Sequence, residues 1–235
     1  MRAGPHGPVF SNMSEKTYKA ALDFSGPEAA FAVADQDRKV IINDFNPMRG
    51  RDSSSLAPWL TQLLQNSHLD INQIKRWTVG SGPGSFTGLR LAAAFVAGLA
   101  FDRPEVACRC VPTAQVMAER TSPAPGDKIA VLHDGRNQEL LLFGAICRDD
   151  GRCEPSGEVR VLSAGSNILD GYRYFAAPER DITAIEKCLG SNIISRITPI
   201  AHPPMEALLT APGAWDNDLT QLVYIRPAAF VKPKF

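Results

Sequence analysis

A glycine-rich turn that runs directly into an uncharged helix constrains the fold of this chain more than any other feature. The turn, GSGPGSFTGLR at residues 80–90, follows the strand-like run IKRWTVG and leads into the apolar run LRLAAAFVAGLAF. After Arg90 the helix expected over 88–101 has no charged side chain, so both of its sides need to be covered. A sheet can cover one side, and the other side needs a second helix from this chain or from a partner.

The turn itself is open to more than one interpretation. It is not a Walker-type phosphate loop, because no Gly-Lys-Ser/Thr sequence ends it. It also lacks the glycine spacing of a dinucleotide fingerprint, and the strands before it form a meander. Two interpretations remain: a tight turn at which only glycine fits, and a helix start that binds an anion through the N–H groups of Ser85, Phe86, Thr87 and Gly88.

The order of the expected elements indicates the fold class. Three strand-like runs, YKAALDF, EAAFAVAD and KVIINDF, follow one another at hairpin spacing and predict an antiparallel meander. A helix within 52–67, the strand IKRWTVG, the apolar helix and a strand at EVACRCV come next. This order predicts an α/β, ribonuclease H-like half-domain of the actin, sugar-kinase and heat-shock ATPase superfamily, which alone says little about function.

The predicted domain organisation has three parts. Residues 1–13 are rich in Gly and Pro and predict a flexible tail. Residues 14–112 form the ribonuclease H-like domain, and residues 113–235 form a smaller, degenerate α+β domain. In this last part we expect a short helix at TAQVMAER, strands at KIAVLHD, ELLLFGAIC and EVRVLS, and no clear strand–helix repeat after about residue 175.

Composition bounds the function and the location. The chain has 25 basic and 25 acidic residues without a basic stripe, which gives no reason to expect strong nucleic-acid binding. Its longest apolar run, 91–101, is too short to span a bilayer, and no leader opens the sequence, so we expect a cytoplasmic protein. The five cysteines and four histidines lack metal-site spacing, so we expect no metal and no cofactor.

The segment GPGSFTGLR, residues 82–90, strongly resembles the signature of the TsaB family, also called YeaZ. It has the same place as in that family, after a strand and before an Ala/Gly-rich helix. The resemblance extends over most of residues 17–140, where ALDFS is similar to the family's Ile-Asp-Thr-Ser opening. HDGRNQEL is similar to its Asp-Ala-Arg…Glu-Val-Tyr segment and gives the matched positions Asp134, Arg136 and Glu139, and VYIR resembles its closing Tyr-Leu-Arg.

The resemblance implies a subunit of a tRNA-modifying assembly. Members of the family act in making threonylcarbamoyladenosine beside the anticodon of tRNA, with only indirect contact to the tRNA. They pair with TsaD, the metal-carrying subunit that transfers the threonylcarbamoyl group, and the small ATPase TsaE completes the assembly. Pairing through the N-domain helices as a four-helix bundle, with TsaD or with a second copy, implies these contact residues: Leu56, Trp59, Leu63, Ala93, Val96, Ala97 and Ala100.

The residues near the turn favour a non-catalytic role. Phosphate-binding members of the superfamily use an Asp-x-Gly-Thr hairpin, whereas here Phe24 follows Asp23 and Pro27 removes an N–H donor. A nucleophile set of Ser85, His133 and Asp134 can be drawn, but nothing in the sequence fixes its geometry. We expect the cleft edge, where an anion or nucleotide could lie, to consist of Asp23, Gly82, Gly84, Ser85, Phe86, Thr87, Gly88 and Arg90.

Two other functions stay open at this point. One is enzymatic: an ATPase or kinase of the same superfamily, or a glycoprotease-like hydrolase. The missing hairpin and second-domain glycines, and the absence of a histidine pair, count against it. The other is a self-contained homodimeric scaffold that uses the same helix surface.

Overall fold

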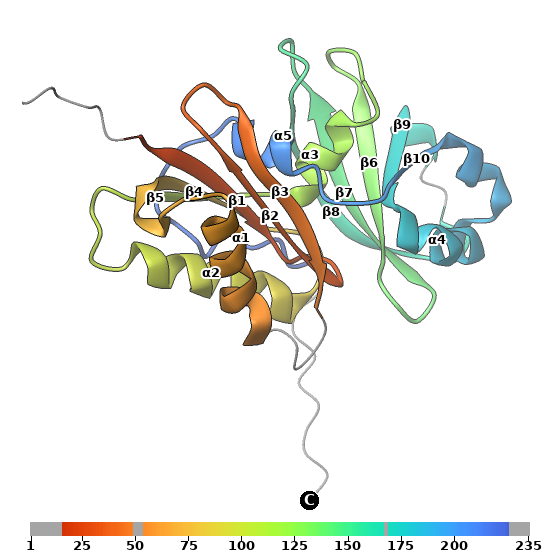
Figure 1. Cartoon of the computed structure of the whole chain (residues 1–235). Coiled ribbons are helices and arrows are strands. Elements are labelled where there is room, and N and C mark those ends of the chain that lie inside the picture. The colour runs from red at the N-terminus through yellow and green to blue at the C-terminus, as the bar shows by residue number, and fades with distance from the viewer. Residues whose placement is uncertain (1–15, 49–53, 167–168, 226–235) are drawn as a thin grey trace, which may run out of the picture.

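The computed structural model describes residues 16–48, 54–166 and 169–225 (Figure 1). The tail predicted for residues 1–13 and the last residue of VYIR therefore lie outside the described residues. Within them the chain forms two five-stranded sheets. No helix in these ranges combines the length and the apolar character needed to cross a membrane.

The first sheet has the strand order β3-β2-β1-β4-β5. The antiparallel meander consists of β1 (Tyr18–Asp23), β2 (Glu28–Ala34) and β3 (Val40–Pro47). β4 (Ile74–Gly80) pairs in parallel with β1, and β5 (Ala107–Val111) pairs in parallel with β4. Three antiparallel strands followed by two parallel strands is the arrangement that the sequence predicted, so the ribonuclease H-like fold class is confirmed.

The two faces of this sheet are covered by different parts of the chain. α1 (Leu56–Asn66) and α2 (Phe86–Ala100) lie on one face, as Figure 1 shows. They pack on Phe31, Trp77 and other large apolar side chains of the strands. The opposite face is lined by alanines of β1 and β2 and is covered by α5 (Met205–Thr210). Small and large residues alternate along β2. Their size therefore sets how closely the helices on each face pack on the sheet.

The second sheet repeats the same topology in the order β10-β9-β6-β7-β8. β6 (Lys128–Asp134), β7 (Glu139–Cys147) and β8 (Cys153–Ser163) are antiparallel, whereas β9 (Tyr174–Pro178) and β10 (Ile197–Ile200) run parallel to β6. Short 3-10 turns, η2 (Ile71–Gln73), η3 (Leu169–Gly171), η4 (Glu179–Asp181) and η5 (Ser191–Arg196), join the elements of both halves.

The strand–helix–strand unit β9-α4-β10 corrects one sequence expectation, because we expected no such repeat after about residue 175. α4 (Ile182–Leu189) has eight residues and β10 has four, including a proline. Segments this short do not complete enough periods to be recognised from their hydrophobic pattern. The helix predicted at TAQVMAER is confirmed as α3 (Thr113–Glu119), which lies with α5 between the two sheets in Figure 1.

The end of the described chain returns to the first sheet. Asn217 exchanges two hydrogen bonds with the backbone of Cys108 on the edge strand β5, of 3.0 and 2.7 Å. The guanidinium carbon of Arg109 lies 4.1 Å from the centroid of the Trp215 ring. Leu219 and Leu222 pack on the core of the first sheet. Residues in the range 205–225 contact the first half of the chain. The domain boundary at residue 112 therefore stays a prediction.

Candidate functional site

The glycine-rich turn packs directly on the turn between β1 and β2. The Ser85 N–H donates a hydrogen bond of 2.7 Å to the Ser25 carbonyl oxygen. A Cβ at Gly84 would lie 2.2 Å from that same oxygen, and a Cβ at Gly88 would lie 1.9 Å from the Phe24 carbonyl oxygen. Any side chain at these two positions would collide with backbone, which favours the interpretation of a turn where only glycine fits.

The start of α2 uses its N–H groups partly within the chain. Ser85 is the N-cap, and its hydroxyl accepts a hydrogen bond of 3.2 Å from the Gly88 N–H. Because the Ser85 N–H is bound to Ser25, two of the four predicted anion donors are already engaged. The anion-binding interpretation is left with the N–H groups of Phe86 and Thr87.

Asp23 is the acidic centre of this region and is fully buried. Its Oδ1 accepts hydrogen bonds from the Ser25 N–H at 2.9 Å and from the Ser25 hydroxyl at 2.7 Å. The hydroxyl of Thr113, at the start of α3, donates to Asp23 Oδ2. Burial raises the pKa of the Asp23 carboxyl above its ordinary value, although these hydrogen bonds act in the opposite direction.

The second sheet contributes a buried histidine, His133, which lines the same small cavity as Ser25. His133 Nδ1 lies 3.9 Å from Asp181 Oδ2, and its Nε2 has no hydrogen-bond partner among the described residues. Burial, followed by the positive charge of Arg180, lowers the pKa of His133 to about 3. The imidazole is therefore neutral at physiological pH.

Arg180 narrows the cleft between the two sheets at the β1–β2 turn. Its guanidinium atoms lie 3.1–3.3 Å from the position that a Cβ at Gly26 would take, so they pack on the β1–β2 turn. Ser25, Thr113, His133 and Arg180 are among the residues that line the cavity left in this cleft, which has a volume of about 10 Å³. That is the size of one water molecule.

The proposed nucleophile set is not assembled. The Ser85 hydroxyl is bound to Gly88, and the Asp134 carboxylate accepts a hydrogen bond of 2.7 Å from the Arg136 N–H. Within the described ranges no hydrogen bond joins Ser85, His133 and Asp134. Asp134 instead donates its backbone N–H to Asp181 Oδ2 at 3.2 Å.

The matched positions Asp134, Arg136 and Glu139 are the last residue of β6, a residue of the β6–β7 turn and the first residue of β7. Arg136 and the two residues after it have positive φ values of 62°, 53° and 58°. The Gly135 N–H donates to the Glu139 carbonyl oxygen at 2.9 Å and closes the turn. These residues form a compact hairpin at the end of the second sheet, next to Asp181.

Three of the residues predicted to contact a partner belong to the interior of this chain. Leu56, Ala93 and Val96 are buried in the core of the first sheet. Their side chains therefore have no free surface for another protein. Three others, Trp59, Leu63 and Ala100, are half-buried against the same core, and Ala97 is exposed.

The free side of α2 joins Arg90 and Ala97, which the sequence analysis named, to Ala94, Gly98 and Phe101, which are absent from its predicted site residues. Arg90, Ala94, Ala97 and Gly98 are exposed and recur at helical spacing, so they share one side of the helix. Phe101 follows directly after the helix and is 82% exposed. We call these five residues the α2 strip. The three- and four-residue spacing from Arg90 was the signal that could have identified it.

Two segments of the family signature meet at the start of α2. The Arg90 guanidinium lies 3.8 Å from the Phe86 ring centroid, and its Nε donates to the Tyr224 hydroxyl at 3.3 Å. The Phe86 and Tyr224 rings are 5.1 Å apart. The Val223 N–H also donates to the Ser81 carbonyl oxygen, at 2.9 Å. GPGSFTGLR and the first residues of VYIR, Val223 and Tyr224, are thus neighbours in the fold.

Comparisons with known proteins agree with this geometry. A family model described as "TsaD: tRNA N6-adenosine threonylcarbamoyltransferase" matches residues 50–189, more than half of the chain. A curated relative from Haemophilus influenzae, the tRNA threonylcarbamoyladenosine biosynthesis protein TsaB, is 36% identical over 81 residues. That match spans 34% of this chain and 34% of the relative, so about a third of the relative's length is covered.

Two solved structures show the same fold. YeaZ from Pseudomonas aeruginosa is 20% identical, with a TM-score of 0.65 over 83% of this chain and 89% of that chain. A protein described as uncharacterized, with similarity to peptidase YeaZ from Pseudomonas aeruginosa, is also 20% identical, with a TM-score of 0.68 over 89% of this chain and 100% of that chain. Together, the family model and the curated relative show that this chain belongs to the TsaB/YeaZ family of TsaD-related proteins.

Proposed function

We propose that this chain is a non-catalytic cytoplasmic subunit that binds TsaD and activates its transfer of a threonylcarbamoyl group to the tRNA adenosine next to the anticodon. The observation that carries the proposal is the α2 strip, which ends in an exposed Phe101. TsaE completes the assembly. This chain contacts the tRNA only indirectly, through the other subunits.

The α2 strip suits a helix–helix interface. Ala94, Ala97 and Gly98 have small side chains, so a helix of the partner can approach α2 closely. Phe101 supplies a large aromatic group of the type that anchors interface cores. Trp59 and Leu63 on α1, which covers the same face of the sheet as α2, are half-buried.

The cleft between the sheets supports a non-catalytic role for this chain. Beside Ser25, at the β1–β2 turn, the cavity left in this cleft has a volume of about 10 Å³, which leaves no room for a nucleotide there. The Gly-rich turn supports the first hairpin through the Ser85–Ser25 hydrogen bond. The turn therefore has a structural role that does not require a phosphate.

The test is a charge placed on the α2 strip. Ala97→Glu adds a carboxylate to an exposed helix position without changing the core, so the monomer should fold normally. We expect this variant to lose co-elution with TsaD from the same genome and to lose the stimulation of threonylcarbamoyl transfer. The matched control is Thr183→Glu, an exposed position on α4 of the second sheet, which should behave like the wild type. A folded Ala97→Glu variant that still binds TsaD would contradict the proposal.

A homodimeric scaffold is the second candidate, because the same strip can pair with its own copy about a two-fold axis. Light scattering after size-exclusion chromatography distinguishes the two functions. If TsaD is the partner, adding TsaD converts a dimer of this chain into a heterodimer. If the scaffold is correct, the homodimer persists in excess TsaD, and Ala97→Glu yields monomers only.

A further inference from the structure

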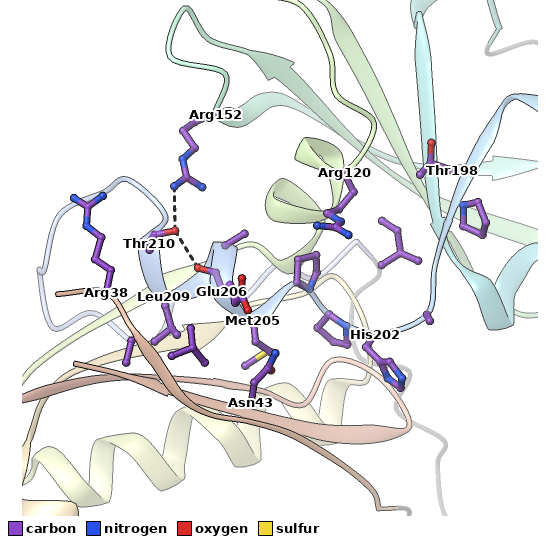
Figure 2. Close-up of a pocket in the computed structure, with 18 residues that line it drawn as sticks. Arg38, Asn43, Arg120, Arg152, Thr198, His202, Met205, Glu206, Leu209 and Thr210 are labelled. Carbon is purple, nitrogen blue, oxygen red and sulfur yellow. Dashed lines mark hydrogen bonds between the residues drawn. The ribbon is translucent and has the colours of Figure 1, made fainter. Parts of the chain in front are cut away.

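A large cavity lies between the two sheets, on the side of α5. It has a volume of about 720 Å³ and is lined by residues 198–207, 209 and 210, from the end of β10 through α5, and by parts of both sheets (Figure 2). This volume falls in the range of about 300–1,000 Å³ that is typical of small-molecule sites. The cavity is separate from the α2 strip, which lies on the other face of the first sheet.

Three arginines line this cavity from three different elements. Arg38 belongs to the turn between β2 and β3, Arg120 follows the end of α3, and Arg152 lies in the turn between β7 and β8. Figure 2 shows Arg152 pointing toward Thr210, with Arg38 on the same side of the cavity, while Arg120 extends from α3. The fold thus brings together guanidinium groups that are far apart in the sequence.

These arginines differ in their partners. Arg152 pairs with Glu119 at 3.0 Å and donates to the Thr210 hydroxyl at 3.0 Å, so it has a structural role. Among the described residues, the side chains of Arg38 and Arg120 have no hydrogen bond and no ion pair. Glu206 is the one acidic side chain in the described lining. The cavity therefore has an excess of positive charge with two unpartnered guanidinium groups.

The geometry points to a binding site for a small molecule that carries phosphate groups, such as a mononucleotide. Guanidinium groups bind phosphate oxygens through charge-assisted, paired hydrogen bonds. The lining also includes the apolar side chains of Val40, Met205 and Leu209, which can contact a base or another flat apolar group.

The charge distribution favours a small ligand over a nucleic acid. RNA binding requires an extended basic surface that follows the backbone. The chain has 25 basic and 25 acidic residues without such a stripe, whereas the cavity is concave and its positive charge is confined to three side chains. This inference is independent of the proposed TsaD partnership, because it concerns a different surface.

Isothermal titration calorimetry of the full chain in the presence of EDTA tests the site with four probes: ATP, inorganic pyrophosphate, adenosine and a short single-stranded RNA. We expect ATP and pyrophosphate to bind and adenosine to give no heat. The double variant Arg38→Gln/Arg120→Gln should weaken both phosphate ligands about tenfold or more, since each lost charged contact is worth about one order of magnitude. The matched control is Arg160→Gln, an exposed arginine on β8 outside the lining, which should leave affinity unchanged.

A gain of affinity provides a second readout that misfolding cannot imitate. Glu206→Gln removes the acidic group of the lining, so pyrophosphate should bind more tightly to this variant. Three results would overturn the inference: no binding of either phosphate compound, binding that is unchanged in the double variant, or binding of RNA without binding of ATP. Thermal unfolding midpoints confirm that all variants are folded.

Discussion

Gly80, the last residue of β4, lies directly against the Asp23 carboxylate of β1: a Cβ at position 80 would be 1.9 Å from Asp23 Oδ2 and 2.8 Å from the Thr113 hydroxyl. Gly84 and Gly88 approach the backbone of Ser25 and Phe24 as closely. The glycines of the motif thus allow the turn before α2, the first hairpin and the start of α3 to pack around one buried carboxylate.

Gly80→Ala should lower the free energy of unfolding by about 3 kcal/mol, because the added methyl overlaps an enclosed carboxylate and the neighbouring strands have to move. The control is Gly98→Ala, where no atom lies within 4 Å of the new Cβ. That change should raise stability by about 0.5–1 kcal/mol, since Gly is unfavourable in a helix interior. Urea unfolding measures both values. Equal stability of Gly80→Ala and the wild type would refute the close packing.

Asp23→Asn should change the pH dependence of stability. Burial raises the pKa of Asp23 above its ordinary value of 3.8, so the folded state holds this proton more strongly than the unfolded state. The contribution of Asp23 to stability is therefore greatest below pH 3.8 and is lost as pH rises through the raised folded value. The stability of Asp23→Asn relative to the wild type should increase over that interval. Urea titrations in steps from pH 4 to pH 7 measure this difference, and a constant difference would show that the pKa is not raised.

His133 should remain neutral over the whole physiological range. Because its pKa is lowered to about 3, the folded state binds this proton less readily than the unfolded state, whose histidine pKa is about 6.5. Its contribution to stability is present above pH 6.5 and is lost as pH falls toward 3. NMR of the imidazole should show no titration between pH 5 and pH 8. His133→Phe should be less sensitive to acid than the wild type, and a titration midpoint near 6.5 would disprove the assignment.

Tyr224→Ala should release the end of the described chain from α2. The change removes the ring contact with Phe86 and the hydrogen bond from Arg90, and we expect a loss of about 1 kcal/mol of stability. Amide hydrogen exchange at Val223, whose N–H is bound to the Ser81 carbonyl oxygen, should become faster. Tyr224→Phe keeps the ring and loses only the hydroxyl, so its effect should be smaller. Unchanged exchange at Val223 in Tyr224→Ala would mean that other contacts hold this segment.

The first half of the fold could be predicted because its signals are local and long. Each of the first three strands alternates over several residues, and α2 has fifteen. The second half was harder, since β10 has four residues and α5 has six. The same limit applies to the site: the motif identified the α2 region, but burial within the chain decided that Leu56, Ala93 and Val96 face inward.

The sequence by itself determined the order of elements in the first sheet, the family signature and the uncharged character of α2, because these follow from neighbouring residues. Only the tertiary structure decided that Arg180 narrows the cleft at Gly26, that Arg38, Arg120 and Arg152 surround one cavity, and that Tyr224 returns to Arg90. Residues 90 and 224 are separated by 134 positions. Contacts over such distances depend on how whole layers pack, and no local pattern encodes that packing.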